Sequence, residues 1–158
     1  MAISPFLARI RQLVGHELLV LPSVAVLPWD EQGRLLLVRQ SDHGQWGTIG
    51  GAVEPDEAPS DAAAREALEE AGVVVELGPI RAVLGGPEFR IRYPNGDETS
   101  YVSIVFDARI VEGEPCPDGD ETLETGWFAP PDLADVQLSS FTRSLLSSAG
   151  IAPLTDAP

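Results

Sequence analysis

The chain has 158 residues, of which 44% are hydrophobic and 22% are charged, a composition typical of one globular domain. Its formal net charge of −15 excludes the basic surface that a nucleic acid polymer or an anionic membrane would attract. The single cysteine, Cys116, excludes an intramolecular disulfide, and the lack of a long apolar run or a signal-peptide pattern predicts a cytoplasmic protein.

The acidic excess is confined to two segments. Residues 51–76 hold eight acidic residues and one arginine, and residues 112–135 hold eight acidic residues and no base. Acids and arginines are equal in number over the rest of the chain. The charge therefore marks two places in the sequence.

The N-terminal part predicts a helix, two strands and a long loop. Apolar residues at helical spacing predict a helix over residues 4–14. A β-branched run over residues 18–27 predicts a strand that starts after Pro22. The apolar segment 35–39 predicts a short strand buried on both faces. Residues 40–58, rich in Gly, Asp and Pro, predict a loop of a length that is usually functional.

The following part predicts a helix over residues 59–71, with Pro59 in its first turn and Gly72 after its last. Further elements are expected as strands at 73–75, 81–84, 88–93, 101–111 and 126–129, a hairpin turn at 94–97, and a C-terminal helix that begins over 141–146. Residues 150–158 are expected to fray. Strands that alternate with helices and hairpins predict an α/β fold with a mixed sheet.

The helix over residues 59–71 is expected to present two different faces. At about 100° per residue, Glu66, Glu69 and Glu70 share one arc within a single turn. A separate apolar stripe is formed by Ala64, Ala67, Leu68 and Ala71. Carboxylates so spaced repel one another, and a hard divalent cation such as Mg²⁺ would offset that repulsion. On this helix alone, a solvated acidic face is the alternative.

The spacing around the helix resembles the signature of the Nudix hydrolase family. The sequence has Gly51, five residues, Glu57, seven residues, and then Arg65-Glu66-Ala67-Leu68-Glu69-Glu70-Ala71-Gly72-Val73. The glycines, glutamates and arginine of the Nudix box all match over residues 51–73, and the resemblance extends over about residues 20–147. It implies the Nudix fold, an α/β/α sandwich around a mixed β-sheet, in one domain over residues 1–158 with an extra N-terminal helix within residues 1–16.

The resemblance also implies an activity and a set of roles. Family members hydrolyse the pyrophosphate bond of a nucleoside diphosphate linked to another moiety, with Mg²⁺ or Mn²⁺ as cofactor. The implied metal ligands are Glu66, Glu69, Glu70 and the Gly50 carbonyl. Arg65 would orient a catalytic glutamate, of which Glu66 and Glu69 are candidates, and Glu57 would anchor the loop.

The proton acceptor and the groups that contact substrate are chosen from the rest of the chain. Glu121, in the second acidic segment, is the candidate general base, and Glu124 is the next candidate; a solvated loop is the alternative for both. Candidates for contact with a nucleotide-type small-molecule substrate are Arg39, Arg90 and Arg92 for phosphate or ribose and Trp46 for stacking on a base. For these, surface charge and core packing are the alternatives.

Rival functions remain at this stage. ADP-ribose or another ADP-sugar, and an oxidised nucleotide, are alternative substrates. A ligand sensor that uses the fold without turnover is expected to lack a box carboxylate, whereas Glu66, Glu69 and Glu70 are all present. The N-terminal helix could pack across a homodimer interface.

Overall fold

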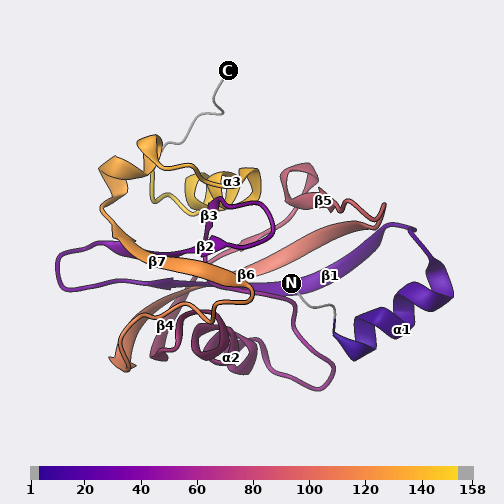
Figure 1. Cartoon of the computed structure of the whole chain (residues 1–158), viewed down its shortest axis with the longest axis horizontal. Coiled ribbons are helices and arrows are strands. Elements are labelled where there is room, and N and C mark those ends of the chain that lie inside the picture. Colours follow the sequence, from indigo (N-terminus) through magenta and orange to yellow (C-terminus); the bar gives the residue numbers. More distant parts are fainter. Residues whose placement is uncertain (1–3, 153–158) are drawn as a thin grey trace.

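The computed structural model describes residues 4–152 and places two β-sheets between helices (Figure 1). In chain order the elements are α1 (Pro5–Val14), β1 (Leu19–Pro28), β2 (Leu35–Gln40), β3 (Trp46–Gly47), α2 (Pro59–Ala71), β4 (Val74–Leu84), the 3₁₀ helix η1 (Pro87–Phe89), β5 (Arg90–Arg92), β6 (Glu98–Glu112), β7 (Thr122–Phe128), the 3₁₀ helix η2 (Pro130–Asp135) and α3 (Ser140–Ser148). Among these residues, no helix is long and apolar enough to cross a membrane.

One sheet is mixed and the other is antiparallel. In the first, β6 lies between β1, with which it runs parallel, and β4, with which it runs antiparallel, and β5 pairs with β6 near the hairpin turn. In the second, β2 lies between β3 and β7. Helix α2 covers one side of the two sheets and α3 the other (Figure 1). The predicted α/β sandwich around a mixed sheet is therefore confirmed.

Alternation along β1 and β2 divides the interior into two cores. Val24 and Val26 of β1 pack on the α2 side, whereas Ala25 and Leu27 pack on the α3 side. Residues Leu35 to Val38 of β2 are fully buried and alternate between the same two cores. The prediction that β2 is buried on both faces is confirmed.

Strand β1 begins at Leu19 and runs through Pro22, whereas a start after the proline was expected. The N–H groups of Val24 and Val26 point away from β6 and donate to the carbonyls of Gly51 (2.9 Å) and Ile49 (2.8 Å). Pro22 lies two residues before Val24, so its backbone nitrogen also faces away from β6. Its missing N–H therefore leaves no β6 carbonyl without a hydrogen bond. The expectation was wrong because it did not account for which edge of β1 the proline faces.

Other boundaries also differ from the predictions, for instance β6, which begins at Glu98 where 101 was expected. Strand β4 is continuous where two strands were expected, because register shifts around Gly78 and Pro79 let it bend without ending. The strand predicted over 88–93 is split into η1 and β5. Strand β7 begins at Thr122, four residues before the predicted 126, because its acidic first half pairs with the end of β2.

Helix α2 has the predicted bounds, and Gly72 takes the left-handed conformation that ends it (φ 66°). Its predicted apolar face is wrong, since Leu68 is 56% exposed and Ala64 is also exposed. The buried face instead consists of Ala62, Ala63, Glu66, Ala67, Glu70 and Ala71. The helix is thus rotated so that two carboxylates point toward the sheets.

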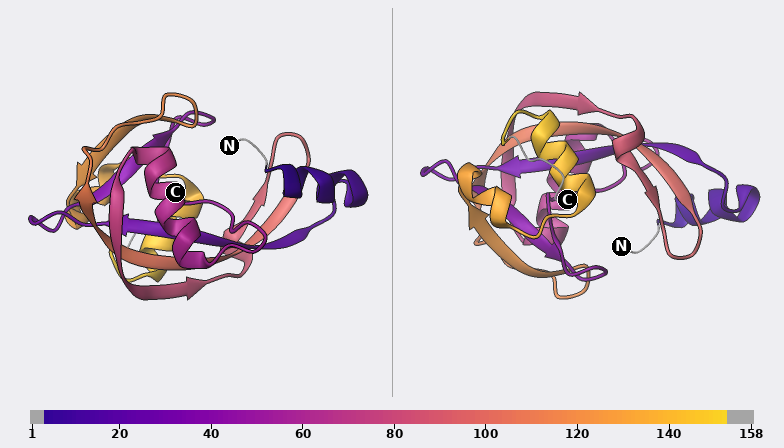
Figure 2. Two further views of the ribbon diagram at one scale, coloured as in Figure 1. Left: turned by 90° about the horizontal axis from the view of Figure 1, so that it is seen from below. Right: turned by 90° about the horizontal axis from the view of Figure 1, so that it is seen from above.

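Helix α1 lies beside the sandwich and not on it (Figure 2), and none of its residues is buried. Its C-terminal turn is attached to the β5–β6 hairpin: the Arg11 guanidinium donates to the Glu98 carbonyl (2.8 Å) and to Thr99 Oγ1 (3.0 Å). His16 Nδ1 lies 2.7 Å from Asp97 Oδ1. At the other terminus, Ile151 and Ala152 pack against the α3 core, and the rest of the tail that was expected to fray lies outside the described residues.

Thr122 fastens the end of α2 to the start of β7. Its fully buried hydroxyl donates to the Glu70 carbonyl (2.8 Å) and accepts from the Asp118 N–H (3.1 Å). We expect Thr122→Val to lower the free energy of unfolding by about 1–3 kcal/mol, because it leaves both groups unpaired. Urea unfolding measures this, with Thr125→Val, whose hydroxyl makes a longer 3.3 Å bond, as the matched control. An unfolding midpoint that both variants shift equally would contradict the role of Thr122.

Candidate active site

Arg65 joins the loop before α2 to the carboxylates on α2. Its guanidinium donates to both Glu57 oxygens, at 2.8 and 3.0 Å, and to the Ala52 carbonyl at 3.2 Å. The same group donates to Glu66 Oε1 (2.7 Å) and to Glu69 Oε2 (3.0 Å). The hydrogen bond from Arg65 lowers the pKa of Glu57, whereas its bonds to Glu57 and then Glu66 raise the pKa of the guanidinium. Arg65 thus fixes the loop and holds two helix carboxylates at once.

Glu70 is the most deeply buried acidic group of the site, with 2% of its surface exposed. Its Oε2 accepts a hydrogen bond from the Gly50 N–H (3.2 Å), and its Oε1 has no hydrogen-bond partner. Burial, followed by the negative charge of Glu66, raises the pKa of Glu70 to about 8, and the amide of Gln40 opposes that rise. Glu70 therefore holds a proton near neutral pH unless a cation approaches it.

Glu66 lies against the double glycine that ends the loop. A Cβ atom on Gly51 would lie 2.2 Å from Glu66 Oε1, so only glycine leaves room for the carboxylate there. A Cβ on Gly50 would lie 2.1 Å from the Val24 carbonyl oxygen. Burial raises the pKa of Glu66, and Arg65 partly offsets this. The two glycines thus make a closely fitted wall beside the carboxylate pair.

Glu121 comes to the same place from the second acidic segment. Its negative charge raises the pKa values of both Glu66 and Glu70. Its backbone N–H donates to Asp118 Oδ1 (3.0 Å), and its carbonyl accepts from the Ser41 N–H (2.9 Å), so the turn that carries it is fixed at both ends. The structure therefore brings Glu121 together with the buried helix carboxylates.

These residues suit a divalent cation. Within residues 4–152, no three acidic, His or Cys side chains are already grouped for a metal ion, and the exposed Glu69 carboxylate is paired with Arg65 at 3.0 Å. A buried carboxylate pair with an unpartnered oxygen nevertheless has the chemistry of a site that lacks its positive charge. Oxygen ligands of this kind are those that Mg²⁺ and Mn²⁺ prefer.

A cavity of about 430 Å³ opens beside the double glycine. Its walls include Gly50 and Gly51 on one side and the rings of Tyr101 and Phe141 on the other. These rings meet edge to face, with centroids 6.0 Å apart. The cavity is large enough for a nucleoside, and it reaches the glycines next to the carboxylates.

The predicted substrate residues are not gathered in one place. Arg92, whose side chain is 76% exposed, lies on the cavity wall, and its Nε is 3.9 Å from Glu98 Oε1. Arg90 donates to the same Glu98 carboxylate and does not line the cavity. Arg39 donates to the Gly44 carbonyl (2.8 Å) and to Glu124 (3.2 Å) on the neighbouring strand.

Trp46 packs edge to face on Phe128, with centroids 4.9 Å apart, and does not line the cavity. Its pairing partner in the second sheet is Arg39, so both residues belong to the same part of that sheet. Arg39, Glu124 and Trp46 thus form a cross-strand group apart from Glu66 and Glu70.

Two residues that sequence reasoning did not single out contribute to the site. Gln40 follows Arg39 on β2, and the alternation of a strand turns it to the α2 side, where its amide acts on Glu70. Phe141 lies at the start of α3 and faces the cavity. The alternation of side chains along β2 predicts that Gln40 faces the same side as Leu36 and Val38, whereas no local sequence pattern points to Phe141.

The comparisons with known proteins agree with this arrangement. The sequence model of the NUDIX domain matches residues 20–148, from β1 to the end of α3. The fold is that of a class of hydrolases that act on phosphoric anhydride bonds. The chain belongs to the Nudix family and is a Nudix pyrophosphohydrolase.

Named relatives are similar over most of the chain. The nucleoside triphosphatase NudI of Escherichia fergusonii is 32% identical over 127 residues, covering 75% of this chain and 89% of that protein. A putative 8-oxo-dGTP diphosphatase of Bacillus subtilis is 33% identical over 108 residues, covering 68% of this chain and 66% of that protein. The crystal structure of the MutT protein from Methanosarcina mazei Go1 superposes with a TM-score of 0.70 at 26% identity, covering 85% of this chain and 95% of that one.

The burial of Glu70 predicts a pH dependence of stability in the metal-free protein. The raised pKa means that the folded state keeps a proton that the unfolded state has lost, so stability falls as pH rises from about 4.5 through about 8. We expect Glu70→Gln, which needs no proton, to remove this fall and to raise the Tm at pH 8. Thermal unfolding in a chelating buffer measures both.

The exposed neighbour Glu69 supplies the control for this prediction. Glu69→Gln changes only a surface ion pair with Arg65, so the fall in stability between about pH 4.5 and 8 should persist. Equal Tm values for wild type and Glu70→Gln at pH 8 would show that the buried Glu70 carboxyl does not lower stability at that pH, and would contradict the prediction.

Proposed function

We propose that this protein hydrolyses nucleoside triphosphates, including oxidised ones, at a pyrophosphate bond with the help of Mg²⁺ or Mn²⁺. The observation that carries the proposal is the buried pair Glu66 and Glu70, with its unpartnered oxygen, next to Gly50 and a cavity of nucleoside size. The names of the two relatives, a nucleoside triphosphatase and a putative 8-oxo-dGTP diphosphatase, favour this substrate class.

The metal would be held by Glu66, Glu69, Glu70 and the Gly50 carbonyl. When bound, the ion neutralises phosphate charge and lowers the pKa of an attacking water. To hold the ion, Glu70 would have to be deprotonated, and Glu69 would have to leave its ion pair with Arg65. Arg65 keeps its bonds to Glu57 and Glu66, so it acts as a positioning residue.

Glu121 would take the proton of the water that attacks phosphorus. Two observations favour Glu121 over Glu124. Its charge acts on Glu66 and Glu70, whereas Glu124 lies in the cross-strand pair with Arg39. Attack forms one P–O bond and breaks the bond to the bridging oxygen, and the proton held by Glu121 is then lost to solvent.

The base and sugar would occupy the cavity. Tyr101 and Phe141 offer aromatic faces for stacking, and Arg92 at the wall can approach the phosphates. Arg39, Arg90 and Trp46 do not line the cavity. We propose that they contact a substrate only where it extends beyond the cavity.

Release of phosphate or pyrophosphate tests the proposed substrate. We expect turnover of nucleoside triphosphates or 8-oxo-dGTP with Mg²⁺ or Mn²⁺ to exceed that of ADP-ribose, and the Glu66→Gln/Glu70→Gln double variant to lose about 10²-fold or more in kcat. Glu76→Gln, at an exposed pair with Arg109, is the control. Preference for ADP-ribose would overturn the substrate class, and no turnover with either ion would overturn the reaction.

The assignment of the base is tested by separating catalysis from metal binding. We expect Glu121→Gln to lower kcat by about 10²-fold while the rise in Tm on adding Mn²⁺ persists, because Glu121 is not among the metal ligands. Glu124→Gln should alter kcat little. If Glu124→Gln gives the larger loss, the roles are reversed; if Glu121→Gln abolishes the rise in Tm, Glu121 is a ligand.

A further inference from the structure

Exposed apolar side chains are concentrated at the α1 end of the molecule. Within residues 4–152, six of the twelve large hydrophobic residues that stay exposed lie in α1, the link after it and the neighbouring strand ends; they are Phe6, Leu13, Val14, Leu18, Val20 and Val102. Leu13 and Val20 are the most exposed of all, at 77% and 66%. We call this set the α1-end patch.

The patch arises because neither helix covers it. Val20 lies on the same face of β1 as Val24 and Val26, which pack in the α2 core. Val102 pairs with Pro22 in the register and belongs to the same face. Helix α2 does not extend over Val20 and Val102, which stay exposed, and none of the α1 residues is buried.

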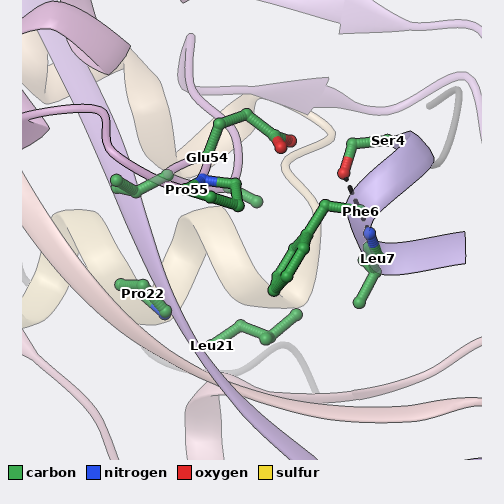
Figure 3. A pocket seen from close by; sticks show the side chains of 9 residues that line it. Ser4, Phe6, Leu7, Leu21, Pro22, Glu54 and Pro55 are labelled. Atoms are coloured by element: carbon green, nitrogen blue, oxygen red, sulfur yellow. Dashed lines mark hydrogen bonds between the residues drawn. The ribbon is translucent and has the colours of Figure 1, made fainter. Parts of the chain in front are cut away.

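A groove continues the patch between α1 and the loop before α2 (Figure 3). It has a volume of about 230 Å³ and is lined mainly by apolar groups, with Phe6 directed toward Leu21 and Pro22. Glu54 lies at its edge, and within residues 4–152 its carboxylate makes no ion pair.

The charge of this end differs from that of the rest. Residues 4–29 carry two arginines and one glutamate in a chain of net charge −15. Arg11 is used in the attachment to the β5–β6 hairpin, whereas Arg9 is exposed and makes no ion pair with the described part of the chain.

The groove and the helix complement each other across two copies. Helix α1 offers apolar side chains with a free cation, and the groove offers an apolar floor with a free carboxylate. A patch that contains both halves is self-complementary, which is the condition for a two-fold symmetric contact.

We propose that the protein forms a symmetric homodimer in which α1 of each copy packs on the groove and strand ends of the other. Arg9 of one copy then faces Glu54 of the other, and Leu13 and Val20 become buried. The contact touches the loop that Arg65 holds, and so it stabilises the wall of the active site from outside. The inference does not depend on the substrate.

Oligomeric state tests the proposal. We expect sedimentation equilibrium of the wild-type protein to give a dimer at micromolar concentration and Leu13→Glu to give a monomer, because the charge would be buried in the contact. Ile80→Glu, at a residue 55% exposed on β4, is the matched control and should remain dimeric. A monomeric wild type, or a dimer that survives Leu13→Glu, would overturn the proposal.

Charge reversal tests the orientation of the two copies. We expect Arg9→Glu and Glu54→Arg each to raise the dimer dissociation constant about tenfold, since symmetry repeats every pair twice. The double variant should recover most of the loss. If the double variant is as weak as the single ones, Arg9 does not face Glu54 and the proposed arrangement is overturned.

Discussion

The structure depends on the burial of two carboxylates on the sheet-facing side of α2. Glu66 and Glu70 occupy positions on which a helix of this kind would ordinarily place apolar side chains, and one oxygen of Glu70 has no partner. Such burial is unfavourable on its own, as the raised pKa of Glu70 expresses. This unfavourable burial is confined to Glu66 and Glu70, and the neighbouring loop and strands contact these two side chains.

The neighbouring residues limit the cost without removing it. Arg65 supplies a positive charge to Glu66 from the loop side, and the Gly50 N–H supplies one hydrogen bond to Glu70. The loop that holds these groups is itself paired to β1 through Val24 and Val26. The edge of β1 on which Pro22 is tolerated is thus the edge that positions the double glycine.

Part of this arrangement could be predicted from the sequence. Pro59 and Gly72 gave the bounds of α2, because proline and glycine determine helix ends locally. The rotation of the helix could not be obtained from periodicity, which assigns Leu68 to the interior. The rotation involves contacts between residues far apart in the sequence, such as the approach of Glu66 to Gly51, where a Cβ atom would lie 2.2 Å from Oε1.

Strand parity explains another difference between sequence and structure. Arg39 drew attention as a cation at the end of an apolar strand, yet it faces the α3 side, and the neutral Gln40 faces the carboxylates. Residue type alone favours the arginine. Only the alternation along β2, in which Leu36 and Val38 face the α2-side core, selects the glutamine.

The two acidic segments can now be separated by what each carboxylate does. In the second segment, Glu124 is paired with Arg39 and Asp118 accepts hydrogen bonds from its own turn, whereas the negative charge of Glu121 acts on Glu66 and Glu70. In the first segment, Glu57 forms an ion pair with Arg65, and Glu66 and Glu70 are the carboxylates that belong to the candidate site. An acidic chain that acts on an anionic substrate requires a cation between the two. The buried carboxylates, which outnumber the guanidinium beside them, are where we propose that this cation binds.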